Sequence, residues 1–260
     1  MNVLLIGDIV GQPGRETIRE LLPGLKEKHQ IEFIIANGEN AAGGNGITPK
    51  IAEQLFDYGV NVITTGDHIW KNKEILRIID KEPRVLRPAN YPAGAPGNGY
   101  SLYLTPSGHT VGVINLMGRV FMQAIDCPFK EASRIIAEIS LKTSIIFVDF
   151  HAEATSEKIA MGWHLDGKVS GIAGTHTHVP TRDARILPQG TAFITDLGMA
   201  GSMDSVIGVD REPVLRRFLT QLPVRFEPAK ENLWLHGVIM KINTDTGLAD
   251  EIKMISEYFK

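Results

Sequence analysis

The chain has one cysteine, Cys127, among its 260 residues. A disulfide within the chain is therefore excluded, and so is a metal site built from several thiolates. No motif supplies Cys127 with a base, so we do not expect it to act as a nucleophile. This cysteine usage is typical of a reducing compartment, and we expect a cytoplasmic protein.

The sequence also lacks long hydrophobic runs and basic tracts. No apolar segment approaches the roughly 18 residues of a membrane span, and the N-terminus has neither the basic lead nor the apolar core of a signal peptide. The formal net charge is −3. We therefore expect neither a membrane nor a long nucleic acid as a partner, whereas a small anionic substrate fits if a metal site concentrates positive charge.

The first third of the chain alternates strands with helices. Short apolar runs predict strands at residues 3–7, 31–36 and 60–65. Helical patterns cover residues 15–29, 49–57 and 73–80; Pro23 is expected to kink or divide the first, and Thr48 to cap the second. This order is typical of a parallel sheet with right-handed crossovers.

The rest of the chain is richer in hairpins. A long ordered loop covers residues 83–100, a hairpin 100–116, further strands 144–150, 169–173 and 191–195, and helices 130–141, 152–164 and 210–219. Residues 233–242 and 251–258 alternate as an antiparallel pair. The prediction is an α/β fold in one domain, residues 1–260. It is a four-layer α/β/β/α sandwich of two mixed sheets, with a parallel early half and an antiparallel-rich late half.

Polar side chains gather where the apolar runs end. In open α/β sheets, ligands bind outside the carboxyl ends of the strands, so these side chains are expected to share one rim. They are Asp8, Glu39, Asn40, Asp67, His68, His151, His176 and His178.

Three carboxylates without a nearby Lys or Arg repel one another, and imidazoles among them make a cation the natural partner. This donor set suits Mn, Fe or Zn rather than Ca. Seven ligands are too many for one ion with an open position. Two ions about 3.5–4 Å apart bind the attacking and leaving oxygens of a phosphoryl displacement.

Each residue has a simpler interpretation when taken alone. Asp8 suits a turn, Glu39 and Asn40 a glycine-rich turn, Asp67 a helix cap, and His151 the core. Their joint position at successive strand ends favours the site.

The roles of several other residues stay open. Trp70 lies in a base pocket or the core. Arg119 contacts a substrate phosphate or a partner subunit or, as we favour, forms a structural ion pair. The remaining histidines match no ligand motif and are assigned to surface or packing positions: His29, His109, His164 and His236.

Five segments carry a family resemblance. They are Gly-Asp-Ile-Val-Gly, Asn-Gly-Glu-Asn-Ala-Ala, Arg-Pro-Ala-Asn, Asp-Phe-His-Ala-Glu-Ala-Thr-Ser-Glu-Lys and Gly-Thr-His-Thr-His, at residues 7–11, 37–42, 87–90, 149–158 and 174–178. The chain resembles the calcineurin-like metallophosphoesterase superfamily. More narrowly, it resembles the bacterial YmdB family of metal-dependent 2′,3′-cyclic nucleotide phosphodiesterases, over nearly its whole length.

The resemblance implies roles for the rim residues. Asp8 and His178 would bind mainly one divalent metal, and Asp67, His151 and His176 the other. Glu39 would bridge the two, with Asn40 at or near the first coordination shell. A metal-bridging hydroxide would attack phosphorus, and His68 would protonate the leaving ribose oxygen as general acid. Fe or Mn is favoured, with Zn or Mg as alternatives.

One position departs from the family pattern. Asp67 stands where the Gly-Asn-His motif has Asn, which adds a negative charge beside Asp8 and Glu39. We expect this change to tighten metal binding and make the metal less electrophilic.

Three functions follow. The first is hydrolysis of 2′,3′-cyclic nucleotides. The second is a phosphatase or diesterase activity on another small phosphoester. The third is a regulatory metal- or nucleotide-binding role with little turnover. A homo-oligomer is compatible with all three.

Overall fold

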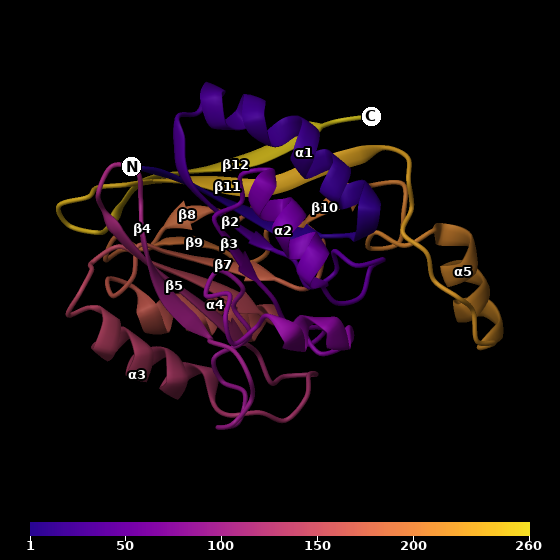
Figure 1. Ribbon diagram of the computed structural model, residues 1–260, viewed down its shortest axis with the longest axis horizontal. Helices are drawn as coiled ribbons and strands as arrows, with labels where there is room; N and C mark the ends of the chain where they lie inside the picture. Colours follow the sequence, from indigo (N-terminus) through magenta and orange to yellow (C-terminus); the bar gives the residue numbers. More distant parts are fainter.

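The computed structural model describes residues 1–260 and contains two six-stranded sheets packed face to face (Figure 1). In the first sheet, β1 pairs in parallel with β2 and β10 and antiparallel with β11. The strand order is β12 (Ala249–Tyr258), β11 (Leu233–Ile242), β10 (Met199–Ser202), β1 (Asn2–Ile9), β2 (Ile31–Asn37) and β3 (Val62–Thr64).

The second sheet has a parallel centre and antiparallel edges. Strands β5, β6, β7 and β9 run in parallel, while β4 and β8 pair antiparallel with β5 and β9. The order is β4 (Tyr100–Leu104), β5 (Thr110–Met117), β6 (Ile146–His151), β7 (Gly171–Thr175), β9 (Ala192–Ile194) and β8 (Arg185–Ile186).

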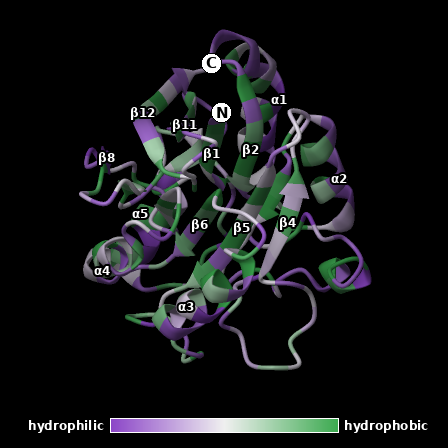
Figure 2. Ribbon diagram, turned by 90° about the vertical axis from the view of Figure 1, so that its left-hand side faces the viewer, coloured by the Kyte–Doolittle hydropathy of each residue, from purple (hydrophilic) through white to green (hydrophobic).

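Three apolar cores separate four layers. Successive strand residues point to opposite faces, so Leu4 of β1 packs beneath the helices α1 (Gly11–Lys28) and α2 (Pro49–Asp57), whereas Val3 faces the second sheet. The outer face of the second sheet packs against α3 (Pro128–Ile139) and α4 (Thr155–Leu165). Figure 2 shows apolar residues along the central strands β1, β2, β5 and β6. The predicted α/β/β/α sandwich is confirmed.

Several element predictions were wrong in detail. Helix α1 begins at Gly11 and continues through Pro23 undivided; Pro13 is tolerated because backbone N–H groups in a first turn have no helical partner. The helix expected at residues 73–80 is a 3₁₀ helix, η1 (Lys73–Arg77). The expected split into a parallel early half and an antiparallel-rich late half holds only in part. The antiparallel pairs β8–β9, β10–β11 and β11–β12 lie in the late half, but β6, β7, β9 and β10 also have parallel partners and β4 pairs antiparallel with β5 in the early half.

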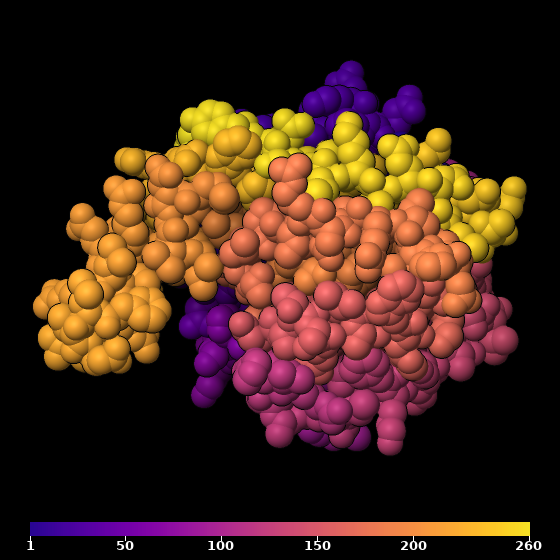
Figure 3. Space-filling model, turned by 180° about the vertical axis from the view of Figure 1, so that it is seen from behind, coloured from indigo at the N-terminus to yellow at the C-terminus, as the bar shows by residue number.

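Helix α5 (Arg211–Thr220) stands away from the sandwich, as Figures 1 and 3 show. Its N-cap is Asp210, where the sequence predicted the helix to begin, and the Asp210 side chain accepts a hydrogen bond from the Glu212 N–H. Val214 is its single buried residue, whereas Phe218 and Leu219 are 72% and 84% exposed. This arm therefore contributes little to the core. No helix in the protein is both long enough and apolar enough to cross a membrane.

Candidate functional site

The carboxyl ends of strands from both sheets meet at one rim. Asp8 lies in β1, Glu39 and Asn40 follow β2, Asp67 and His68 follow β3, His151 ends β6, and His176 and His178 follow β7. Each of the eight predicted residues lies within 4.0 Å of another member of the set. The sheet packing therefore assembles side chains that are up to 170 residues apart in the sequence.

One half of the site is a compact group of two carboxylates and two imidazoles. His151 Nε2 lies 3.1 Å from Glu39 Oε1, 3.3 Å from Asp67 Oδ1 and 3.0 Å from His176 Nδ1. Two ligand atoms that each lie about 2.1 Å from one metal, at right angles, are about 3 Å apart. The spacing of these four donors therefore fits a single transition-metal ion.

The other half contains Asp8, Asn40 and His178. His178 Nε2 lies 3.7 Å from Asp8 Oδ1 and 3.1 Å from Asn40 Nδ2. Asp8 Oδ1 is fully buried and has no hydrogen-bond partner, which is costly for a carboxylate oxygen. Asn40 Nδ2 also lies 3.3 Å from Glu39 Oε1, so Glu39 contacts both halves.

In His151, His176 and His178, the two ring nitrogens have different roles. One nitrogen of each contacts a polar group outside the centre: His151 Nδ1 lies 2.9 Å from Thr175 Oγ1, His176 Nε2 3.0 Å from Glu153 Oε2, and His178 Nδ1 2.8 Å from the Ile207 carbonyl. The second nitrogen of each ring points toward the carboxylates. Metal-bound histidines use this arrangement, because the outer contact fixes the ring and its tautomer.

Electrostatics also favour a cation. Burial raises the pKa of Asp8 to about 6, against the opposing influence of His178 and His151. Burial alone would lower the pKa of His151, but Glu39, Asp67 and Asp8 together raise it well above the ordinary histidine value. Burial would raise the pKa of Asp67, yet its bond from His151 and the nearby imidazoles lower it. In the metal-free protein, the carboxylates of Asp8 and Asp67 and the imidazole of His151 therefore share protons. Divalent metal ions fit the same set of carboxylate and imidazole donors.

His68 differs from the inner histidines because its side chain is 31% exposed. Its Nδ1 lies 2.8 Å from Asn40 Oδ1, and its backbone N–H donates to Glu39 Oε2 at 3.1 Å. The Nε2 atom lies 3.6 Å from Asp67 Oδ2, beyond hydrogen-bonding distance. One ring nitrogen is thus anchored at the centre, and the other stays available on its open side.

The His-x-His segment has a strained backbone. His176 and His178 have φ values of 100° and 64°, in the left-handed region that non-glycine residues avoid. The His176 N–H donates to Asp8 Oδ2 at 3.1 Å. Asp196 Oδ2 accepts from the Thr177 N–H and hydroxyl at 3.2 and 2.8 Å. Carboxylates beneath the turn therefore hold both histidines toward the centre.

Sequence reasoning missed the buried polar residues below the rim. Their signal was a polar residue inside or just after a short apolar strand, or a lysine on the inner face of a helix. They are Asn37, Thr64, Asp149, Lys158, Thr175 and Asp196.

The remaining predictions had mixed outcomes. Arg119 is exposed and forms no ion pair, so that expectation is wrong; its backbone N–H donates to the Glu157 carboxylate instead. Trp70 packs against the helix-side core and makes an edge contact with Tyr91 at 5.7 Å between ring centroids. The aromatic ring therefore has a packing role.

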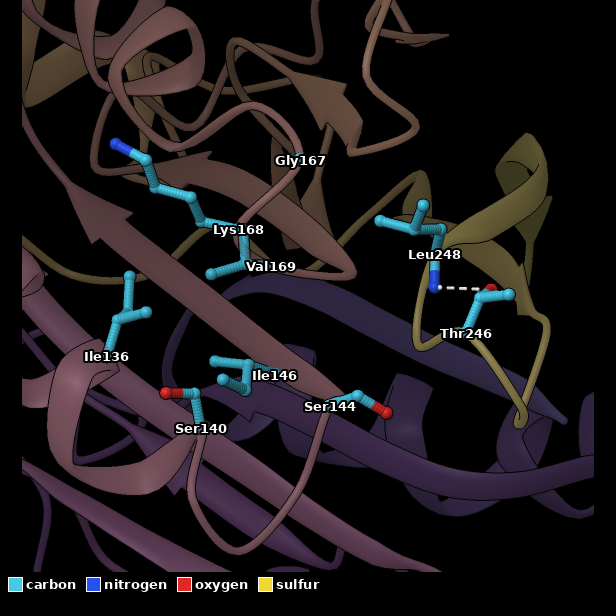
Figure 4. A pocket seen from close by; sticks show the side chains of 9 residues that line it. All are labelled: Ile136, Ser140, Ser144, Ile146, Gly167, Lys168, Val169, Thr246 and Leu248. Carbon is cyan, nitrogen blue, oxygen red and sulfur yellow. Dashed lines mark hydrogen bonds between the residues drawn. The ribbon is translucent and has the colours of Figure 1, made fainter.

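One cavity lies away from the rim. It has a volume of about 330 Å³ and lies near the amino ends of β6 and β7; Figure 4 shows the side chains that line it. Its lining contains no carboxylate or imidazole, so it offers none of the chemistry found at the strand ends. The lining residues are Ile136, Ser140, Ser144, Ile146, Gly167, Lys168, Val169, Thr246 and Leu248.

Two facing mixed sheets with a carboxylate and imidazole centre at their common rim define a calcineurin-like metallophosphoesterase fold. The model of the YmdB-like protein family matches residues 4–255, and the chain belongs to that family.

Relatives with names and structures agree with this membership. A Bacillus subtilis (strain 168) protein named 2′,3′-cyclic-nucleotide 2′-phosphodiesterase is 50% identical over 255 residues, which cover 98% of this chain and 96% of the relative. A crystal structure of a Thermus thermophilus protein superposes with a TM-score of 0.93 at 38% identity, covering 99% of both chains. A Mycoplasma pneumoniae structure, described as a novel phosphatase, has a TM-score of 0.93 at 34% identity and covers 99% and 93% of the two chains.

Proposed function

We propose that the chain is a dinuclear metal-dependent phosphodiesterase that hydrolyses 2′,3′-cyclic nucleotides. The carrying observation is the convergence of three carboxylates, three imidazoles and the Asn40 amide with one more exposed histidine at a single rim. The substrate class follows the name of the Bacillus subtilis relative, which is half identical to this chain. We also propose that residues 1–260 form one metallophosphoesterase domain, since the family model spans residues 4–255.

The distances support a division of the ligands between two ions. Asp67, His151 and His176 would hold one, Asp8 and His178 the other, with Glu39 between them and Asn40 at the edge. When bound, two such cations supply a water of lowered pKa as nucleophile and neutralise charge on the phosphoryl oxygens. Fe or Mn suits this oxygen and imidazole set, with Zn or Mg as alternatives.

His68 would complete the reaction from the chain's side. The Asn40 amide oxygen fixes its Nδ1, which leaves Nε2 to give a proton to the leaving ribose oxygen. An imidazole suits this task because its ordinary pKa lies near neutral pH.

Substrate choice is tested with a panel of phosphoesters. Protein stripped with a chelator and reconstituted with Mn²⁺ is expected to hydrolyse 2′,3′-cyclic AMP faster than 3′,5′-cyclic AMP or p-nitrophenyl phosphate. Preference for the monoester would move the proposal to a phosphatase, the word used for the Mycoplasma pneumoniae structure. Nucleotide binding without metal-dependent turnover of any substrate would favour the regulatory role.

Asp67→Asn tests the departure from the family motif. Loss of one negative charge beside Glu39 and His151 is expected to weaken Mn²⁺ binding by on the order of tenfold and to raise turnover of the metal-saturated enzyme. Calorimetric Mn²⁺ titration and initial rates at saturating Mn²⁺ measure the two effects separately. If neither value changes, Asp67 has no special role.

Gly66→Ala tests the tight packing of the metal ligands. A Cβ at Gly66 would lie 2.1 Å from His151 Cδ2 and 2.3 Å from Glu39 Oε2, so both ligands must move. We expect Mn²⁺ affinity to fall by at least about tenfold. The control is Gly24→Ala, because a Cβ at Gly24 meets no atom within 4 Å. Equal Mn²⁺ affinity in both variants would show that the centre adapts to the methyl group.

A further inference from the structure

A buried polar chain leads from the metal-facing histidine His151, at the carboxyl end of β6, to Thr175 of β7 and back to Asp149 of β6, all within the second sheet. His151 Nδ1 lies 2.9 Å from Thr175 Oγ1, and Thr175 Oγ1 lies 2.7 Å from Asp149 Oδ1. His151 and Thr175 are fully buried, and Asp149 is 4% exposed. Water therefore has little access to the protons along this chain.

The partners of Asp149 fix the direction of these hydrogen bonds. Asp149 Oδ2 accepts from the Thr64 hydroxyl and from Asn37 Nδ2, the latter at 3.0 Å. Its Oδ1 has Thr175 as the neighbouring donor. A carboxylate only accepts, so the single hydroxyl proton of Thr175 points to Asp149. The Thr175 oxygen then presents a lone pair to His151.

That lone pair selects one tautomer of His151. In the neutral imidazole, the form that binds a metal, Nδ1 then carries the proton and donates it to Thr175, which leaves Nε2 deprotonated. Asn37 Nδ2 also lies 3.5 Å from Nδ1 and 3.4 Å from Thr175 Oγ1, but both contacts are longer than the 2.9 Å between Nδ1 and Thr175 Oγ1. Nε2 is the atom that lies 3.1 Å from Glu39 Oε1 and 3.0 Å from His176 Nδ1. The opposite tautomer would put a proton where a metal ion binds.

We propose that Asp149 and Thr175 are positioning residues that act through one hydrogen-bond relay to hold His151 in its metal-binding tautomer. The proposal rests on the metal centre of the proposed function. Neither residue touches substrate, and the relay is complete without a bound ion.

Thr175→Val removes the relay hydroxyl at nearly constant volume. We expect Zn²⁺ affinity, measured by calorimetric titration of the chelator-stripped protein, to fall by about 10–100-fold. Thr175→Ser keeps the hydroxyl and is expected to restore most of the affinity. The matched control is Thr64→Val, which removes another hydroxyl from Asp149 without contacting His151; its affinity should change by at most about threefold.

Asp149→Asn reverses the relay. The amide oxygen is expected at the Oδ2 position, where Thr64 and Asn37 donate. The amide NH₂ then faces Thr175, whose proton turns toward His151 Nδ1 and favours the wrong tautomer. We expect a loss of Zn²⁺ affinity at least as large as that of Thr175→Val. The double variant should lose little more than the weaker-binding single variant, because both act through one chain.

The measurements distinguish an effect of the relay on Zn²⁺ affinity from a loss of folding stability and from an error in the proposed substrate. Thermal unfolding of the metal-free variants shows which remain folded, and Thr175→Ser and Thr64→Val keep the test open if one variant does not fold. Equal Zn²⁺ affinity for Thr175→Val and wild type, equal losses for Thr64→Val and Thr175→Val, or additive losses in the double variant would overturn the proposal. Zn²⁺ affinity requires no turnover, so failure to hydrolyse 2′,3′-cyclic AMP would contradict the proposed function and leave this measurement valid.

Discussion

His68→Ala is expected to lower the turnover of 2′,3′-cyclic AMP by about 10²–10⁴-fold, the usual contribution of a general acid. The metal content should stay unchanged, because the His68 ring contacts Asn40 and lies outside the group formed by Glu39, Asp67, His151 and His176. Initial rates of Mn-reconstituted wild type and variant, with metal analysis of both, measure the effect. The control is His109→Ala, in the turn between β4 and β5.

A change of leaving group tests the proton-donor role more sharply. The nitrophenolate released from bis(p-nitrophenyl) phosphate is a weak base and needs little protonation as it departs. His68→Ala should therefore lower the turnover of this substrate much less than the turnover of 2′,3′-cyclic AMP. Equal losses on both diesters would contradict proton donation and assign His68 to substrate binding or to the shape of the centre.

Lys158→Met is expected to cost about 3–5 kcal/mol in the free energy of unfolding, because it leaves a buried carboxylate without its cation. Lys158 Nζ lies 2.6 Å from Asp196 Oδ2, and both side chains are 1% exposed. Methionine keeps most of the length and apolar packing of lysine, so the lost charge dominates. Urea denaturation of metal-free protein, followed by circular dichroism, measures the change.

The partner substitution separates the charge from the packing. Lys158→Met combined with Asp196→Asn should recover much of the loss, since an amide is less costly to bury than an unpaired carboxylate. If Lys158→Met alone lowers the free energy of unfolding by less than about 1 kcal/mol, the Lys158–Asp196 pair contributes no more than a surface ion pair. The same variant is expected to weaken metal binding, because Asp196 also holds Thr177 between His176 and His178.

The sequence was most informative about the first sheet and the rim. Continuous apolar runs such as residues 3–7 mark strands covered on both faces, and a polar residue at the end of such a run stands at a sheet edge. This reasoning located Asp8, Glu39 and His151 without any knowledge of their partners. The motifs then indicated the YmdB family, and the family model and the Bacillus subtilis relative confirm that membership.

Local patterns were less reliable where tertiary contacts outweigh propensity. Strand β10 reads Met-Ala-Gly-Ser and has no strand signal of its own. It forms because its backbone pairs with β1 on one side and β11 on the other. Helix α1 contains two prolines and still runs from Gly11 to Lys28, because its apolar stripe, which includes Ile18 and Leu22, is buried against the first sheet.

The sequence by itself determined the family, the four-layer fold and the eight rim residues, since each of these depends on residue type and order along the chain. Only the tertiary structure decided how those residues are oriented. The relay through Asp149 and Thr175, the Lys158–Asp196 pair and the outward contacts of the three imidazoles join residues from different strands and helices. Their distances and hydrogen-bond directions depend on how the strands of the second sheet pair and how α4 and the loops pack against them, and local patterning along one strand does not contain that information.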